Sequence, residues 1–157
     1  MSKGSERRAT TAVDRRSRES SQTPAKLFRS EVILVEDDRE LADLICFALE
    51  SVGVTVTIFN NGVDALDGLA ALPEREVRRL VLLSVDIGGI DGHTLHERLI
   101  SLRPDAFLVA FMSSRASEAD QIRALRGGAI DYLVKPVSMH VLIEKVRVWQ
   151  TIISGDQ

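Results

Sequence analysis

Hydrophobic residues beyond position 30 alternate between two spacings, one typical of buried strands and one typical of amphipathic helices. Short apolar runs bounded by turn residues predict five strands, at residues 32–35, 55–59, 80–85, 107–112 and 131–134. Helical spacing predicts five helices, at residues 41–52, 63–72, 94–103, 118–126 and 141–153. Strict alternation of such strands with helices indicates a parallel sheet covered on both faces. We therefore expect an α/β fold of flavodoxin-like (βα)5 type, a doubly wound sheet of five parallel strands in the order 2-1-3-4-5.

Charged residues divide the chain into a basic arm and an acidic body. Residues 1–30 carry eight Lys or Arg and three Asp or Glu, for a net charge of +5, whereas the remainder has a net charge of −8. The one clear apolar pair of the arm is Leu27–Phe28, so burial cannot offset the entropy of ordering, and we expect a disordered arm. A contact between this basic arm and an acidic partner is the alternative. The acidic body argues against direct DNA binding by residues 31–157.

Composition indicates a single cytoplasmic domain. The 157 residues are 45% hydrophobic with a mean hydropathy of +0.03, which suits one globular core. No apolar run approaches the roughly 20 residues of a membrane span, and no apolar signal segment begins the chain, so we expect no membrane contact. The single cysteine, Cys46, cannot form an internal disulfide, which favours a reducing compartment.

Polar side chains gather where the predicted strands end, and these ends meet at one edge of a parallel sheet. They are Glu36 and Asp37, Ser84 and Asp86, Ser113, and Lys135. Two adjacent carboxylates repel each other unless a cation joins them, and either Mg²⁺ or the lysine would serve. The set therefore indicates a site for a metal ion and a phosphoryl group, with the ordinary polarity of loops as the alternative.

Four segments in this order resemble the receiver domain of bacterial two-component response regulators. They are "ILVEDD", "LVLLSVDIGGIDG", "FMSS" and "GGAIDYLVKP", and the resemblance covers about residues 32–149. It implies a receiver-like domain over residues 31–157, preceded by an arm at residues 1–30. It also implies that the protein acts in two-component-type signal transduction and is not an enzyme. Because no output domain pattern follows the last helix, we expect output through a protein contact, unless the chain is a fragment.

The resemblance also implies roles for individual residues. Glu36 and Asp37 match the acidic pair that holds Mg²⁺ in the family, and Ser113 matches the hydroxyl that responds to phosphorylation. Tyr132 matches the switching aromatic residue, Lys135 the lysine that contacts the phosphoryl group, and Pro136 the proline that follows a cis peptide bond.

The phosphoacceptor aspartate of the family is absent. Its position falls on Ser84, and the usual Pro-Gly of the next loop is replaced by Gly88-Gly89. A serine hydroxyl cannot form the acyl phosphate on which the family's chemistry rests, and the change removes one Mg²⁺ ligand. Asp86 is the alternative acceptor, although two residues along a strand move a carboxylate by several ångström.

We therefore expect an atypical receiver, or pseudo-receiver, that acts as a phosphorylation-independent protein-interaction module. No cofactor is required, and any Mg²⁺ binding is expected to be weak. One alternative is a Mg²⁺-dependent switch phosphorylated on Asp86 or on a serine. A weaker alternative is a small-ligand or metal sensor that uses the same pocket.

The last predicted helix carries a second apolar stripe, formed by Val141, Val148 and Ile152, beside the stripe that must cover the sheet. In the receiver family the fourth helix, fifth strand and fifth helix form the partner and dimerisation face, so we expect a protein partner there, with a homodimer as one form. His93 and His96 have a spacing compatible with Zn²⁺, but they lack a third ligand, and a half-exposed helix start is the simpler interpretation.

Overall fold

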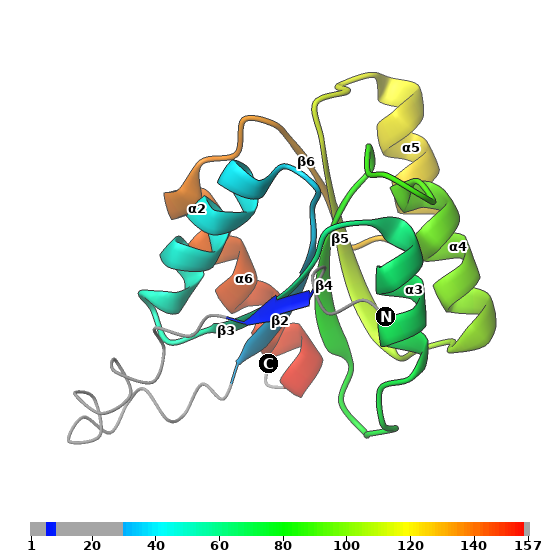
Figure 1. Cartoon of the computed structure of the whole chain (residues 1–157), viewed down its shortest axis with the longest axis horizontal. Helices are drawn as coiled ribbons and strands as arrows, with labels where there is room; N and C mark the ends of the chain where they lie inside the picture. Colours follow the sequence, from blue (N-terminus) through cyan, green and yellow to red (C-terminus); the bar gives the residue numbers. More distant parts are fainter. Residues whose placement is uncertain (1–5, 9–29, 156–157) are drawn as a thin grey trace.

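The computed structural model describes residues 6–8 and 30–155, which form one sheet and five helices (Figure 1). The strands are β1 (Glu6–Arg8), β2 (Glu31–Val35), β3 (Thr55–Phe59), β4 (Arg79–Ser84), β5 (Phe107–Ser113) and β6 (Asp131–Val134). The helices are α2 (Arg39–Glu50), α3 (Gly62–Ala70), α4 (Gly92–Leu102), α5 (Glu118–Arg126) and α6 (Met139–Ser154).

The sheet confirms the expected topology. Its order is β1-β3-β2-β4-β5-β6, and the pairs β2–β3, β2–β4, β4–β5 and β5–β6 are all parallel. With the five predicted strands numbered along the chain, this order is 2-1-3-4-5. Such an arrangement collects the carboxyl ends of all five strands at one edge of the sheet.

The sheet has one further strand, β1, formed by residues 6–8, which the apolar pattern did not predict. This strand pairs antiparallel with β3, with Glu6 opposite Phe59 and Arg8 opposite Thr57. An edge strand presents unpaired backbone N–H and C=O groups, and pairing with them requires no apolar side chain, so a hydropathy argument does not detect it. Residues 1–5 and 9–29 of the predicted arm lie outside the described residues.

Helices cover both faces of the sheet, each over its own apolar layer. Figure 1 shows α2 and α6 on one face and α3, α4 and α5 on the other. The first layer includes Ile45, Leu142 and Trp149, and the second includes Leu95 and Phe111. Each of these side chains is at most 4% exposed, so the five parallel strands form a buried scaffold that fixes the positions of its loops.

Four of the helices begin before the predicted first residue because polar capping residues precede the apolar period. Asp38, Asn61, Asp91 and Ser138 each accept a hydrogen bond from a backbone N–H of the first turn. The N–H of Thr94 donates to Asp91 and lowers the pKa of that carboxyl, although burial acts in the opposite direction. No helix within residues 30–155 has the length and apolarity that crossing a membrane requires.

Candidate functional site

The strand ends bring together side chains that are far apart in the sequence. Glu36 directly follows β2, Ser84 is the last residue of β4, and Ser113 is the last residue of β5. Register places Ser84 beside Met112 and Ser113 beside Val134, so Lys135 follows at the same edge. The fold therefore brings Glu36, Ser84, Ser113 and Lys135 to one edge of the sheet, as the order of the strands predicted.

Glu36 is the centre of this site. One of its carboxylate oxygens, Oε1, accepts hydrogen bonds from the Ser84 hydroxyl and from Lys135 Nζ, the latter at 2.8 Å. The other oxygen, Oε2, accepts the backbone N–H of Asp38 at 3.0 Å. Glu36 is 1% exposed and Ser84 is fully buried. We refer to Glu36, Ser84 and Lys135 as the buried triad, a carboxylate whose charge is balanced inside the domain.

Asp37 lies outside the buried triad and is exposed to solvent. Partial desolvation, followed by the neighbouring Glu36 carboxylate, raises the pKa of its carboxyl, while Lys135 acts in the opposite direction. The two adjacent acids therefore have different environments, because Glu36 is neutralised by Lys135 and Asp37 faces water.

In this conformation Glu36 is not free to act as a magnesium ligand. Mg²⁺ requires near-octahedral oxygen ligands that are free to bind it, but Oε1 of Glu36 is occupied by an ammonium group and a hydroxyl. Within the described part of the chain, no group of three or more His, Cys, Asp or Glu is placed to hold a metal ion.

Ser113 and Tyr132 are linked through Arg115. The backbone N–H of Arg115 donates to Ser113 Oγ at 3.0 Å, and the Tyr132 hydroxyl donates to the Arg115 carbonyl at 3.0 Å. Tyr132 is 7% exposed and lies near Phe111, so its ring is turned inward. Lys135 N donates to the Ser113 carbonyl, and the Lys135–Pro136 peptide is cis.

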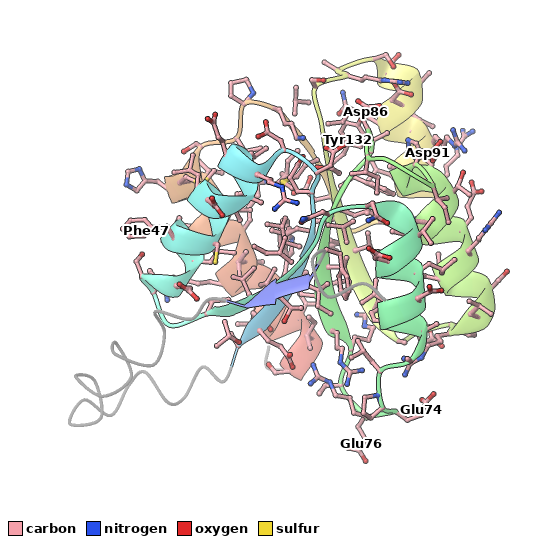
Figure 2. All side chains as sticks on the ribbon, in the orientation of Figure 1. Phe47, Glu74, Glu76, Asp86, Asp91 and Tyr132 are labelled. Carbon is pink, nitrogen blue, oxygen red and sulfur yellow. The ribbon has the colours of Figure 1, made fainter. Side chains whose placement is uncertain are left out.

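Asp86 is placed differently from the buried triad. Its side chain is 50% exposed and forms an ion pair with Arg115 at 3.2 Å. Figure 2 shows Asp86 near Tyr132 at the strand-end side of the molecule. The β4–α4 loop that carries Asp86 folds back tightly, since a side chain at Gly92 would collide with the carbonyl oxygen of Ser84, and Gly89 has a positive φ of 86°.

Sequence reasoning misjudged the start of α4. His93 and His96 are each 5% exposed, and their ring centroids lie 5.0 and 5.2 Å, respectively, from that of Phe111. The prediction of a half-exposed helix start is therefore wrong. Burial is the largest cause that lowers the pKa of both imidazoles. His96 lies on the same helical face as the buried Leu99, three residues further along, a register that could have revealed the burial of His96.

The two apolar stripes of α6 separate clearly. Leu142, Val146 and Trp149 are buried, whereas Val141 is 50% and Val148 is 56% exposed. Ile152 belongs to the exposed stripe at 38%. A shallow hollow on this helix is lined by Val141 and Val148 with charged neighbours on either side.

Comparisons with known proteins identify the family of this chain. Residues 32–147 match the family described as Response regulator receiver domain. Transcriptional regulatory protein CreB of Escherichia coli (strain K12) is 34% identical over 119 residues, which are 76% of this chain and 50% of CreB. A 14.6 kDa protein of Leptolyngbya boryana is 36% identical over 122 residues, covering 77% of this chain and 90% of that protein. The chain therefore belongs to the response regulator receiver family.

A solved structure shows the same fold. The CheY-like receiver domain protein of Methanospirillum hungatei JF-1 superposes with a TM-score of 0.72 at 23% identity, over 82% of this chain and 98% of that one. The chain spans about half the length of CreB. Membership of the family places the protein in two-component signal transduction.

Proposed function

We propose that this protein is an atypical receiver that holds one conformation and binds a protein partner without being phosphorylated. The observation that carries the proposal is the buried triad: Ser84 stands at the end of β4, and its hydroxyl and Lys135 both bind Glu36. The lysine that would contact a phosphoryl group is already paired with a carboxylate inside the domain.

The chemistry of Ser84 supports this proposal. An acyl phosphate forms when a carboxylate oxygen attacks phosphorus and the donor's leaving group departs with the bonding electrons. A serine hydroxyl lacks this carboxylate and must also lose its proton. Ser84 Oγ donates to Glu36 and is fully buried, so a phosphoryl donor has no approach to it in this conformation.

Asp86 is the competing acceptor, because its carboxylate is exposed and its partner Arg115 is linked to both Ser113 and Tyr132. A phosphoryl group on Asp86 would compete with that ion pair. Lys135, however, is already paired with Glu36 at 2.8 Å. The unphosphorylated state therefore remains the better proposal.

The partner surface that we propose combines α5, β6 and α6. Val141 and Val148 on α6 are half-exposed, and Leu125 on α5 and Val134 on β6 are also exposed. Apolar side chains gathered on adjacent elements are typical of a protein contact. We propose a protein partner there, which includes a second copy of the chain, in a cytoplasmic setting that suits a sequence with a single cysteine.

The test is whether the full-length protein responds to Mg²⁺ and a phosphoryl donor. Trp149 fluorescence and the mass measured by light scattering are recorded with and without millimolar Mg²⁺ and acetyl phosphate. We expect no change in either. Ser84→Asp, which restores a carboxylate at the end of β4, is the matched positive control. A response of the unaltered protein equal to that of the control would refute the proposal.

A further inference from the structure

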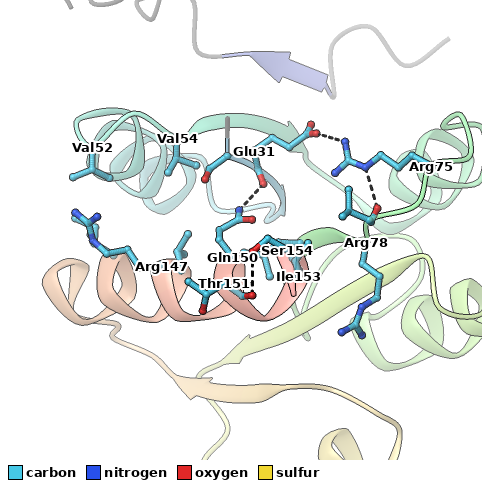
Figure 3. Close-up of a pocket in the computed structure, with 15 residues that line it drawn as sticks. Glu31, Val52, Val54, Arg75, Arg78, Arg147, Gln150, Thr151, Ile153 and Ser154 are labelled. Atoms are coloured by element: carbon cyan, nitrogen blue, oxygen red, sulfur yellow. Dashed lines mark hydrogen bonds and ion pairs between the residues drawn. The ribbon is translucent and has the colours of Figure 1, made fainter. Parts of the chain in front are cut away.

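A second cavity lies at the opposite edge of the sheet from the buried triad. Its volume is about 330 Å³, within the range of small-molecule pockets. It is bordered by the amino ends of β2 and β4, the segment between α3 and β4, and the last turns of α6. Figure 3 shows these elements around the cavity, with α6 along one side.

One part of the wall of this cavity is apolar. Val54, Leu80 and Val146 are buried side chains that line it, and Val52 and Ile153 complete the apolar surface. Polar side chains also line it, among them Thr151, Ser154 and Gln150, whose Nε2 donates to the Glu31 carbonyl oxygen at 3.1 Å. The apolar part of a ligand in this cavity would therefore lie against the aliphatic side chains of one part of the wall.

The rim of the cavity is positively charged. Arg75, Arg78 and Arg147 line it together with a single acid, Glu31. Glu31 is paired with Arg75 at 2.6 Å, and Arg147 has only a 3.7 Å contact with Glu144. Arg78 forms no ion pair within the described residues. This rim belongs to a body whose net charge is −8 over residues 31–157, so the positive charge is a local feature.

We propose that this cavity binds an anionic amphiphile, a small molecule with one carboxylate or phosphate monoester head on an apolar body. The apolar body would lie against Val54 and Val146, and the head would be held by Arg78 and Arg147, whose planar guanidinium groups suit carboxylate and phosphate oxygens. Because the site lies at the opposite edge of the sheet, its ligand would not occupy the buried triad.

The experiment separates the two parts of the ligand. Full-length protein is titrated with octanoate, octyl phosphate, octanol and inorganic phosphate, followed by Trp149 fluorescence and by amide chemical shifts. Trp149 is the only tryptophan and precedes Gln150 on α6, so its emission reports on this wall. We expect saturable binding of one or both anionic amphiphiles, with shifts confined to the cavity residues, and at least tenfold weaker binding of octanol and phosphate. The two amphiphiles decide between a carboxylate and a phosphate head.

Variants test the role of the arginines. Arg78→Gln and Arg147→Gln are each expected to weaken amphiphile binding by about tenfold, because each removes a charge-assisted hydrogen bond. Arg126→Gln is the matched control, since Arg126 lies on α5, which covers the other face of the sheet. Equal binding of octanol and octanoate, unchanged affinity in both variants, or shifts outside the cavity would each overturn the proposal. Thermal unfolding of each variant verifies that it is folded.

Discussion

Removing the ammonium group of Lys135 tests the buried triad most severely. In Lys135→Met, the Glu36 carboxylate, 1% exposed, keeps only the Ser84 hydroxyl and the Asp38 N–H as partners. Breaking a buried ion pair on one side costs about 3–5 kcal/mol. The Lys135 side chain is 21% exposed, so water screens part of the interaction, and we expect a loss of about 2–3 kcal/mol in the free energy of unfolding.

The assay is urea unfolding followed by Trp149 fluorescence, where a loss of this size shifts the midpoint by about 1 M. Lys145→Met is the matched control, since Lys145 pairs with Asp131 at 2.6 Å but both side chains are partly exposed, and about 0.5 kcal/mol is expected. Adding Glu36→Gln to Lys135→Met removes both charges and should recover most of the loss. Equal destabilisation by Lys135→Met and Lys145→Met would refute the reasoning.

Three further predictions address the site, the histidines and α6. Ser84→Asp places a second carboxylate against buried Glu36, so the variant should melt below the unaltered protein without Mg²⁺ and gain stability with it; a melting temperature indifferent to Mg²⁺ would contradict this. Burial lowers the pKa of His93 and His96 in the folded state. The stability that their neutral forms contribute is therefore complete above the unfolded-state pKa of about 6.5 and is lost as pH falls towards the lower folded-state values. Urea unfolding across this pH range measures the loss, and the double variant His93→Gln/His96→Gln should make the free energy of unfolding depend less on pH. Leu142→Ala should lower the free energy of unfolding by about 2–4 kcal/mol, and Val148→Ala should lower it by less than about 0.5 kcal/mol. Of the two variants, only Val148→Ala should weaken partner binding or self-association. Equal unfolding midpoints for the two variants would show that the buried and exposed stripes are assigned wrongly.

The sequence predicted the sheet and its order because apolar periodicity and the handedness of crossovers leave few alternatives. Strands such as Phe107–Ser113 are buried on both faces, and this burial is visible as an unbroken apolar run. The helices were predicted to start too late, because capping residues such as Asp38 and Asp91 begin a helix through their side-chain oxygens and do not belong to the apolar pattern. Strand β1 was missed for a related reason, since pairing at a sheet edge through backbone groups leaves no apolar period in the sequence.

The sequence predicted which residues lie at the candidate site but not how their side chains pair there. That Glu36, Ser84, Ser113 and Lys135 share one edge follows from parallel topology. That Lys135 pairs with Glu36, while Asp37 faces solvent, depends on side-chain directions that spacing does not fix. The cavity at the opposite edge was not predicted, because its arginines come from two segments about 70 residues apart that meet only in the folded chain.

The central claim is that the protein acts without accepting a phosphoryl group, and intact mass is its most direct test. The full-length protein and Ser84→Asp are incubated side by side with Mg²⁺ and acetyl phosphate, and both masses are measured. We predict that the unaltered protein keeps its mass while Ser84→Asp gains one phosphoryl group. A phosphoryl gain on the unaltered protein, located to Asp86 or Ser84 by fragmentation, would contradict the claim and identify a switch in its place.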